Sequence, residues 1–325
     1  MNKRRLLLSF LLVVVIPQFL FSLFLRDSPK KDPIKEEPII HPEHSNFISV
    51  KDGESVIQME LDDYVAGVVL GEMPADFELE ALKAQAVATR TYTLRRVLRS
   101  GKHSNAHVCT ESACCQAFVP VSEYLGGDEK LEKVNHAVKE TSGQVLTYDG
   151  KLIEATYFST SGGRTEDAVA VWGANVPYLR SVDSPGEEIS KHYETAVTIS
   201  VGDFIKKLGL PADFQLSEDN IDVTYTNGGG VDTLTLDGKT FSGTQLRTLL
   251  DLSSTALTLD IAGDRVLITT KGNGHRVGMS QYGAEAMAVN GYSYDQILLH
   301  YYSGATLEEF TEEQINAIFD KAENL

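Results

Sequence analysis

Cysteine is scarce in this 325-residue sequence, and its three cysteines, Cys109, Cys114 and Cys115, all lie within seven residues. Because three is an odd number, a complete set of disulfide pairs is excluded. Positive charge is also scarce, since 29 lysines and arginines face 46 aspartates and glutamates, for a formal net charge of −17. No run of basic residues follows the apolar N-terminal segment, so we expect no nucleic-acid partner.

A small-residue cleavage site is lacking at the end of the one long apolar run, residues 6–25. This run carries no charge and follows Lys3, Arg4 and Arg5. At about 1.5 Å per residue, a helix of this length spans a hydrocarbon core of about 30 Å. The basic residues predict a cytoplasmic N-terminus and an extracytoplasmic remainder. We therefore predict a single transmembrane anchor over residues 1–26, with a cleaved signal peptide as the alternative.

The rest of the chain divides by composition. Residues 27–45 are rich in proline and charge and poor in aromatics, which predicts an extended stalk linker. Residues 46–325 are numerous enough to bury a sizeable core, and helical and strand-like patterns mix along them. Residues 187–270 alternate strand-like and short helical pieces. We therefore predict an α+β fold with a smaller α/β subdomain inserted at residues 187–270.

The stretch "GVVLGEMP", residues 67–74, ends a run of apolar residues with Glu72. From Leu61 onward, apolar residues recur at helical spacing, and Asp62 is available as the N-cap. Pro74 disfavours helical geometry at Met73. We therefore expect a helix that starts near residue 61 and ends near Glu72.

Glu72 lies seven positions after Val65 and four after Val68, so its carboxyl group shares the apolar stripe of that helix. Burial disfavours the ionised form and raises a carboxyl pKa by as much as about 3–5 units. A carboxylic acid that stays protonated near neutral pH is what a general acid requires. The alternative is a frayed helix end, which would leave Glu72 solvated at the surface.

A second helix is expected at residues 78–98, where several alanines leave room for close packing against a neighbour. Lys83 and Arg90 lie seven positions apart on this helix and therefore on one face. They can provide donors for a polar ligand, or they can be ordinary solvated charges.

The loop "HSNAHVCTESACC" brings together His103, His107 and all three cysteines. Thiolate and imidazole ligands suit tetrahedral zinc, although this spacing is not that of a standard zinc finger. A disulfide from Cys109 to Cys114 or Cys115 is an alternative in an oxidising compartment, and free thiols are another.

Three long blocks occur in order along the chain: "GEMPADFELEALKAQAVATRTY", "TYFSTSGGRTED" and "GHRVGMSQYGAEAMAVNGYSYDQILLHYYSGA". With the apolar N-terminus, they resemble the stage II sporulation protein D family, membrane-anchored lytic transglycosylases of endospore-forming bacteria. The resemblance implies cleavage of the MurNAc–GlcNAc bond in peptide-stripped peptidoglycan strands, leaving 1,6-anhydroMurNAc ends, during engulfment in sporulation. The glutamate of "GEMP", here Glu72, would be the single catalytic residue, and the chemistry would need no cofactor.

The resemblance also implies a set of substrate-binding residues. Arg90 is expected to line the cleft or to orient Glu72. The others come from the three blocks: Lys83, Gln85, Tyr157, Ser159, Ser161, Gly162, Gly163, Arg164, His275, Gln281 and Tyr282. Trp172, the only tryptophan, is expected either as a sugar-stacking wall or as a core residue. Arg276 departs from the family, in which we expect a small residue, commonly glycine, after the histidine.

In the cysteine–histidine loop, the resemblance implies a structural zinc ion held by His103, Cys109 and Cys115, with Cys114 available as a fourth ligand. The implied partners are peptidoglycan glycan strands, a sporulation amidase and a polytopic membrane protein. The implied location is the mother-cell membrane, with the catalytic domain outside the cytoplasm and facing the forespore. A non-catalytic glycan-binding scaffold that activates a partner amidase is the alternative function.

Overall fold

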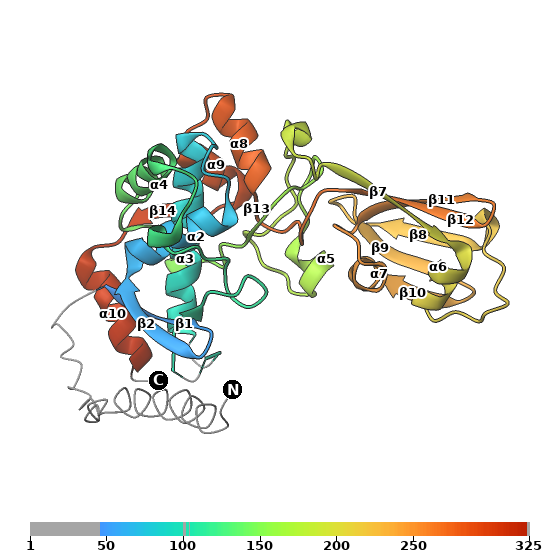
Figure 1. Ribbon diagram of the computed structural model, residues 1–325, viewed down its shortest axis with the longest axis horizontal. Helices are drawn as coiled ribbons and strands as arrows, with labels where there is room; N and C mark the ends of the chain where they lie inside the picture. The colour runs from blue at the N-terminus through green and yellow to red at the C-terminus, as the bar shows by residue number, and fades with distance from the viewer. Residues whose placement is uncertain (1–45, 100–101, 104, 324–325) are drawn as a thin grey trace, which may run out of the picture. The chain divides into compact units, whose positions relative to one another are not determined.

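The protein is described from a computed structural model, which covers residues 46–99, 102–103 and 105–323 (Figure 1). The predicted anchor and stalk, residues 1–45, lie outside the described residues, so both stay predictions. None of the helices in the described part has the length and hydropathy that a membrane-spanning segment needs. All described residues belong to one compact unit, His44–Leu325, and its mixture of helices and strands agrees with the predicted α+β class.

An antiparallel hairpin begins the described chain. Strands β1 (Phe47–Asp52) and β2 (Ser55–Glu60) pair along their whole length around a turn at Gly53, whose φ of +58° suits glycine. The short strand β3 (Val108–Cys109) pairs in parallel with β1. This pairing holds the start of the cysteine-bearing loop against the hairpin.

Helix α2 (Leu61–Glu72) follows the hairpin directly and buries its apolar stripe. It ends as Pro74 requires, because Met73 is extended, with a φ of −127° and a ψ of 138°. The expected cap by Asp62 is wrong. The N-cap residue is Glu60, which makes no side-chain capping bond, and the Asp62 carboxylate has a different partner, described below.

The long helix α3 (Leu79–Leu98) lies at the centre of the larger hydrophobic core. Four of its alanines are fully buried, which lets neighbouring backbones approach closely: Ala81, Ala84, Ala86 and Ala88. Besides α2, it contacts four helices: α4 (Asp128–Glu140), α8 (Gln281–Val289), α9 (Tyr294–Tyr301) and α10 (Glu312–Glu323).

Two small sheets complete this part of the molecule. Strand β4 (Gln144–Tyr148) lies between β5 (Lys151–Leu152) and β14 (Thr306–Glu309), with antiparallel pairing throughout. Strands β6 (Tyr157–Phe158) and β13 (Met279–Ser280) pair in parallel. The second pairing places the blocks "TYFSTSGGRTED" and "GHRVGMSQYG" side by side, although the insertion separates them in the sequence.

A second, separate hydrophobic core lies within the predicted insertion (Figure 1). One antiparallel sheet has the order β11 (Ala256–Ala262), β12 (Arg265–Lys271), β7 (Glu194–Ser200). The other has the order β10 (Lys239–Ser242), β9 (Val231–Leu236), β8 (Ile221–Tyr225). Helices α6 (Val201–Lys207) and α7 (Gly243–Leu250) contribute the buried Phe204 and Leu246 to this core.

Candidate active site

A groove of about 290 Å³ opens between the end of α2, the cysteine-bearing loop and the β6–β13 region. Segments far apart in the sequence line it: Glu72, Tyr92, Ser112, Cys115, Gln116, Thr156, Tyr157, Phe158, Ser159, Asn273, Gly274 and His275. Among these described lining residues, Glu72 is the only carboxylic acid. Hydroxyl, amide and aromatic groups make up most of the rest, which suits a polar, uncharged ligand such as a sugar.

Glu72 is the last residue of α2 and is half-buried, as expected from its place on the apolar stripe. Its Oε1 accepts a hydrogen bond from the backbone N–H of Ala117 at 2.6 Å, and the Gln281 side chain lies close enough to favour the ionised carboxyl group. Burial raises the pKa of Glu72, and the Ala117 N–H and the Gln281 amide offset part of that increase. The group is therefore neither frayed nor freely solvated.

Two polar side chains meet beside Glu72. The Tyr157 hydroxyl donates to Oε1 of Gln116 at 2.8 Å, and Nε2 of Gln116 donates to the Thr93 hydroxyl at 3.0 Å. Burial, together with the nearby Glu72 charge, raises the pKa of Tyr157 well above its usual range, so the phenol stays neutral. Sequence reasoning missed Gln116, whose only signal was its place directly after the cysteine pair.

His275 closes the groove on another side. Its ring lies 5.5 Å from that of Phe158 and 5.3 Å from that of Trp172, which ends the short helix α5 (Ala168–Trp172). Its Nδ1 accepts a hydrogen bond from the N–H of Val277 at 3.1 Å. Burial lowers the pKa of His275 to about 4, so the ring is neutral near pH 7 and carries its proton on Nε2. Trp172 is 45% exposed, so it is not a core residue.

Gln281 connects Glu72 to the helices behind the groove. Its Nε2 donates to Oε1 of the fully buried Gln85 at 3.4 Å. Tyr282 packs its ring edge-to-face on Phe77, with 5.0 Å between the centroids. Gln85, Gln281 and Tyr282 therefore lie behind or beside Glu72, and none of them is among the described residues that line the groove.

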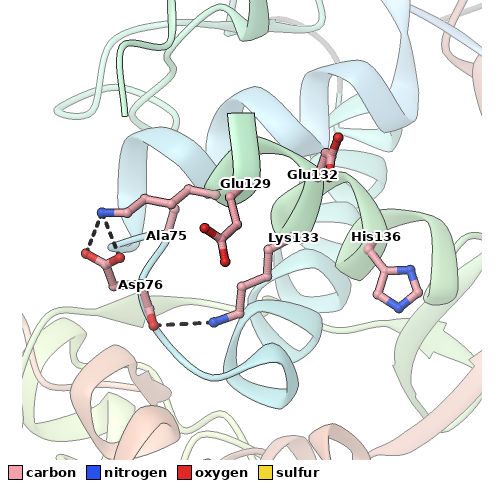
Figure 2. A pocket seen from close by; sticks show the side chains of 7 residues that line it. Ala75, Asp76, Glu129, Glu132, Lys133 and His136 are labelled. Carbon is pink, nitrogen blue, oxygen red and sulfur yellow. Dashed lines mark hydrogen bonds and ion pairs between the residues drawn. The ribbon is translucent and has the colours of Figure 1, made fainter. Parts of the chain in front are cut away.

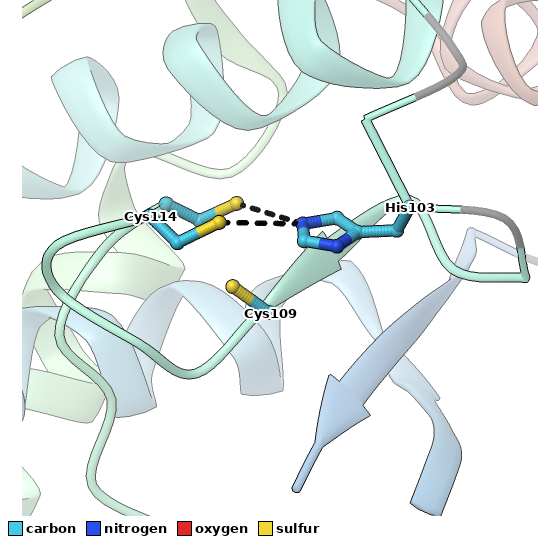
Figure 3. A group of neighbouring side chains, drawn as sticks. His103, Cys109 and Cys114 are labelled. Atoms are coloured by element: carbon cyan, nitrogen blue, oxygen red, sulfur yellow. Dashed lines mark hydrogen bonds between the residues drawn. The ribbon is translucent and has the colours of Figure 1, made fainter. Parts of the chain in front are cut away.

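The cysteine-bearing loop forms a compact cluster (Figure 3). One ligand atom from each of four residues lies within 4.8 Å of all the others: His103, Cys109, Cys114 and Cys115. Nε2 of His103 lies 3.4 Å from Sγ of Cys115 and 3.8 Å from Sγ of Cys114. The three cysteines are free thiols, which argues against the alternative of a disulfide.

These spacings fit a tetrahedral metal ion. With Zn–S bonds of about 2.3 Å, two ligands of one zinc ion lie about 3.8 Å apart. Burial raises the pKa of the Cys109 thiol to about 12, so a thiolate at this position calls for an adjacent cation. Cys114 belongs to the cluster, whereas His107 bonds to Ser49 through Nδ1 instead.

Comparison with known proteins finds related chains that cover most of this sequence. Residues 50–148 match the family described as stage II sporulation protein. A stage II sporulation protein D of Bacillus subtilis is 38% identical over 263 residues, which cover 79% of this chain and 76% of the relative. A namesake from Bacillus amyloliquefaciens is 38% identical over 293 residues, 88% of this chain and 83% of the relative.

The chain belongs to the stage II sporulation protein D family. An amidase enhancer of Bacillus subtilis is also similar, at 30% identity over 301 residues, which cover 75% of this chain and 40% of that protein.

Two basic residues of this family member lie away from the groove, contrary to expectation. Arg90 is fully buried, and its guanidinium group bonds to the Asp62 carboxylate at 2.9 and 3.1 Å. A buried cation requires such a partner, so Arg90 neither lines the cleft nor contacts Glu72. Lys83, whose side chain is 12% exposed, forms an ion pair with Glu140 at 2.6 Å, between α3 and α4.

The hydrogen-bond donors of the "STSGG" loop are bound to another residue of the protein. The N–H groups of Ser161 and Gly162 and the Ser161 hydroxyl donate to the buried Glu187 carboxylate, at distances of 2.6 to 3.0 Å. Gly163 lies at a φ of +106°, and Arg164 pairs with Asp183. The expected sugar-binding amides thus already have an acceptor. From this block, Tyr157 and Ser159 line the groove.

Arg276 takes the place of the small residue expected after the histidine. Its φ is +63°, the left-handed region that favours glycine, and its side chain is almost fully buried. Four contacts hold it there: Nη1 with Glu166 at 3.1 Å, Nε with the carbonyl of Ser161 at 2.7 Å, and Nη2 with the carbonyls of Arg164 and Gly228 at 2.8 and 2.7 Å. The bond to Gly228 ties the His275 loop to the insertion.

A second hollow, of about 480 Å³, lies between the loop after α2 and helix α4 (Figure 2). Both of its lysines have partners: Lys130 lies 2.7 Å from the Asp76 carboxylate, and Lys133 donates to the Asp76 carbonyl. Glu72 is not among the described residues that line it, so we assign the candidate active site to the first groove.

Proposed function

We propose that this protein is a peptidoglycan lytic transglycosylase that cleaves the MurNAc–GlcNAc bond and leaves 1,6-anhydroMurNAc ends. The observation that carries the proposal is one half-buried carboxyl group, Glu72, at a groove whose described lining contains no second acid. Membership of the stage II sporulation protein D family supports the same conclusion.

The proposed reaction needs one carboxyl group that changes role. Protonated Glu72 donates its proton to the glycosidic oxygen, and the C1–O bond breaks as an oxocarbenium-like centre develops on muramic acid. The Glu72 carboxylate then takes the proton of the C6 hydroxyl, whose oxygen closes on C1. Glu72 ends the cycle protonated again. Ordinary glycosidases need a second carboxylate to activate water or to act as nucleophile, and an internal hydroxyl removes that need.

The neighbouring groups fit this sequence of roles. Burial raises the pKa of Glu72 and so favours the protonated form that must begin the reaction. The Ala117 N–H and the Gln281 amide stabilise the carboxylate that forms next and hold its orientation. Ser159 and the neutral His275 line the same groove and offer polar contacts to sugar hydroxyl and acetamido groups.

The cysteine–histidine cluster would hold a zinc ion with a structural role. His103, Cys109, Cys114 and Cys115 would be its ligands, and the ion would link two ends of the loop that carries Ala117. When bound, zinc supplies rigidity to this loop, and no step of the proposed reaction uses it.

The proposed setting is engulfment during sporulation, with the protein anchored in the mother-cell membrane and its catalytic domain facing the forespore. The proposed substrates are glycan strands that a partner amidase has stripped of stem peptides, and a polytopic membrane protein is the proposed third member of the complex. The similar amidase enhancer supports the link to an amidase.

The test compares Glu72→Gln with Glu285→Gln. Glu285 is a matched control, because burial also raises its pKa and it also accepts a backbone N–H, that of Glu78 at 2.6 Å, yet it does not line the groove. Peptide-stripped glycan is digested, and anhydromuramic ends are counted by mass spectrometry. We expect Glu72→Gln to lose at least about 100-fold in rate and Glu285→Gln to retain most of it. Equal product yields from wild type and Glu72→Gln would refute the proposal.

A non-catalytic scaffold that binds glycan and activates an amidase is the second candidate, and the similar amidase enhancer favours it. This function does not require the proton of Glu72. Full stimulation of a partner amidase and normal engulfment with Glu72→Ala, together with no anhydromuramic product from wild type, would favour the scaffold over the enzyme.

A further inference from the structure

The segment that donates to Glu72 lies directly against helix α2. The N–H of Ala117 donates to Oε1 of Glu72 at 2.6 Å, and two residues later the N–H of Val119 donates to the carbonyl of Gly67 at 3.0 Å. Both acceptors belong to α2, so the chain from Ala117 to Val119 follows the last turns of this helix. Such a path requires the backbone of the segment to approach the helix closely.

Gly71 leaves the space for this approach. A Cβ atom at position 71 would lie 2.8 Å from the carbonyl carbon of Ala117 and 2.8 Å from the backbone nitrogen of Phe118. Real Cβ atoms essentially never come closer than 3.0 Å to another heavy atom, so the backbone of the segment would have to shift. Glycine also stabilises a helix less than alanine does, so helix formation does not account for a glycine at this position.

Gln116 also fixes the peptide group that reaches Glu72, because the donating N–H belongs to the peptide between Gln116 and Ala117. The Gln116 side chain is 2% exposed. Its Oε1 accepts a hydrogen bond from the Tyr157 hydroxyl at 2.8 Å, and its Nε2 donates to the Thr93 hydroxyl at 3.0 Å. With the side chain held at both ends, the adjoining peptide has little freedom to rotate.

The hydrogen bond from Ala117 distinguishes the two oxygens of Glu72. In a protonated carboxyl group the carbonyl oxygen is the better acceptor, so the proton lies on Oε2 while Oε1 accepts the N–H. Once the proton has left, the same N–H stabilises the negative charge as a charge-assisted hydrogen bond. Oε2 is then the oxygen that can accept a proton from the substrate.

We propose that Gly71 is a positioning residue for the catalytic carboxyl group. It admits the Ala117 peptide to the end of α2, the N–H of that peptide holds Oε1 of Glu72, and Oε2 carries out both proton transfers. The inference rests on the proposed function and adds to it the atom that moves the proton. Gly71 is not among the described residues that line the groove, so it acts only through Ala117 and Glu72.

The experiment compares three changes in the whole chain. Gly71→Ala adds a Cβ against the backbone of Ala117. Lactic acid incorporated in place of Ala117 converts that amide to an ester, which removes the N–H and leaves every side chain as it is. Gly67→Ala is the matched control, because it also adds a Cβ on α2, but this Cβ would lie 2.2 Å from the ring of Phe118, a side chain that can rotate.

Gly71→Ala and the ester should each lower kcat for anhydromuramic end formation by at least about tenfold and leave KM within about twofold. The reason is that the N–H stabilises the carboxylate formed in the reaction and does not contact the sugar. The two changes combined should lower kcat no further than the ester alone, whereas a general loss of packing would add to it. Gly67→Ala should keep kcat within about threefold, even where it lowers the midpoint of thermal unfolding.

The pH dependence gives a readout that a merely structural role would not move. The N–H favours the ionised carboxyl group, so its loss should move the fall of the rate to higher pH in both the Gly71→Ala and ester proteins, but not in Gly67→Ala. The other titratable side chains that line the groove are the same in all of these proteins: Tyr92, Cys115, Tyr157 and His275. Carbon-13 NMR titration of the Glu72 carboxyl group should show the same upward shift without depending on activity.

Two results would overturn the inference. One is an ester protein with the wild-type kcat and the wild-type Glu72 titration, which would remove the role of the Ala117 N–H. The other is a folded Gly71→Ala protein that behaves like Gly67→Ala. If Gly71→Ala does not fold, the ester protein decides, because the N–H is the group through which Gly71 acts.

The inference and the proposed function can fail separately. Either overturning result would leave the proposed reaction intact if Glu72→Gln still abolishes anhydromuramic products. Conversely, a shifted Glu72 titration in the Gly71→Ala and ester proteins, with no such products from the wild type, would keep the positioning role and remove the lyase.

Discussion

Arg276, the residue after His275, is held by contacts from which the effect of its replacement on stability can be calculated. Arg276→Gly would restore the small residue expected there and relieve a left-handed backbone, worth about 1 kcal/mol. It would also leave the Glu166 carboxylate, 1% exposed, without its ion-pair partner. Breaking a buried pair from one side costs about 3–5 kcal/mol. We therefore expect Arg276→Gly to lower the free energy of unfolding by about 2–4 kcal/mol.

The assay is urea unfolding followed by Trp172 fluorescence, since that ring lies beside His275. The double variant Arg276→Gly/Glu166→Gln also removes the unpaired carboxylate. Its loss of unfolding free energy should therefore be smaller than the sum of the losses of the two single variants, by about 1–3 kcal/mol. Arg164→Ala, at a mostly exposed pair with Asp183, is the control and should lose less than about 1 kcal/mol. An Arg276→Gly protein as stable as the wild type would refute the reasoning, because relief of the strain would then fully offset loss of the buried ion pair.

Two further predictions concern pH and metal. Burial raises the pKa of Glu72 above its ordinary value of 4.5, so the folded state binds this proton more tightly than the unfolded chain does, and that stabilisation is lost as pH rises through the folded value. In urea titrations, Glu72→Gln should therefore be more stable than the wild type at neutral pH but not below pH 4.5. The wild-type rate of anhydromuramic end formation should fall as the pH rises through the same range. A rate that grows with pH would contradict this. Elemental analysis should find zinc in the purified protein. The Cys115→Ser variant should lose the zinc and show faster hydrogen exchange at the Ala117 amide. The His107→Ala variant should keep both the zinc and the wild-type exchange rate. Intact protein that takes up no zinc would contradict the assigned ligands.

Local patterns were sufficient for much of the candidate site. Apolar spacing and Pro74 predicted helix α2 and its end, and the same spacing placed Glu72 on the buried stripe. The crowding of cysteines in one loop predicted a cluster, because residues so close in sequence have few ways to lie apart. These features depend on neighbours within a few residues, so single-sequence reasoning reaches them.

Features set by distant partners were not predictable in this way. Arg90 has the sequence context of an exposed helical cation, and its burial depends on Asp62, which lies on another helix. The donors of Ser161 and Gly162 looked free for a ligand, but they bind Glu187.

The most direct test of the central claim is a crystal structure of the Glu72→Gln protein with a peptide-free GlcNAc–MurNAc oligomer. The distance to measure runs from the substituted side chain at position 72 to the nearest glycosidic oxygen. We predict hydrogen-bond contact, about 2.6–3.2 Å, with the C6 hydroxyl of muramic acid on the same side. An oligomer bound elsewhere, or lying in the groove with no glycosidic oxygen within reach of that side chain, would contradict the catalytic role of Glu72.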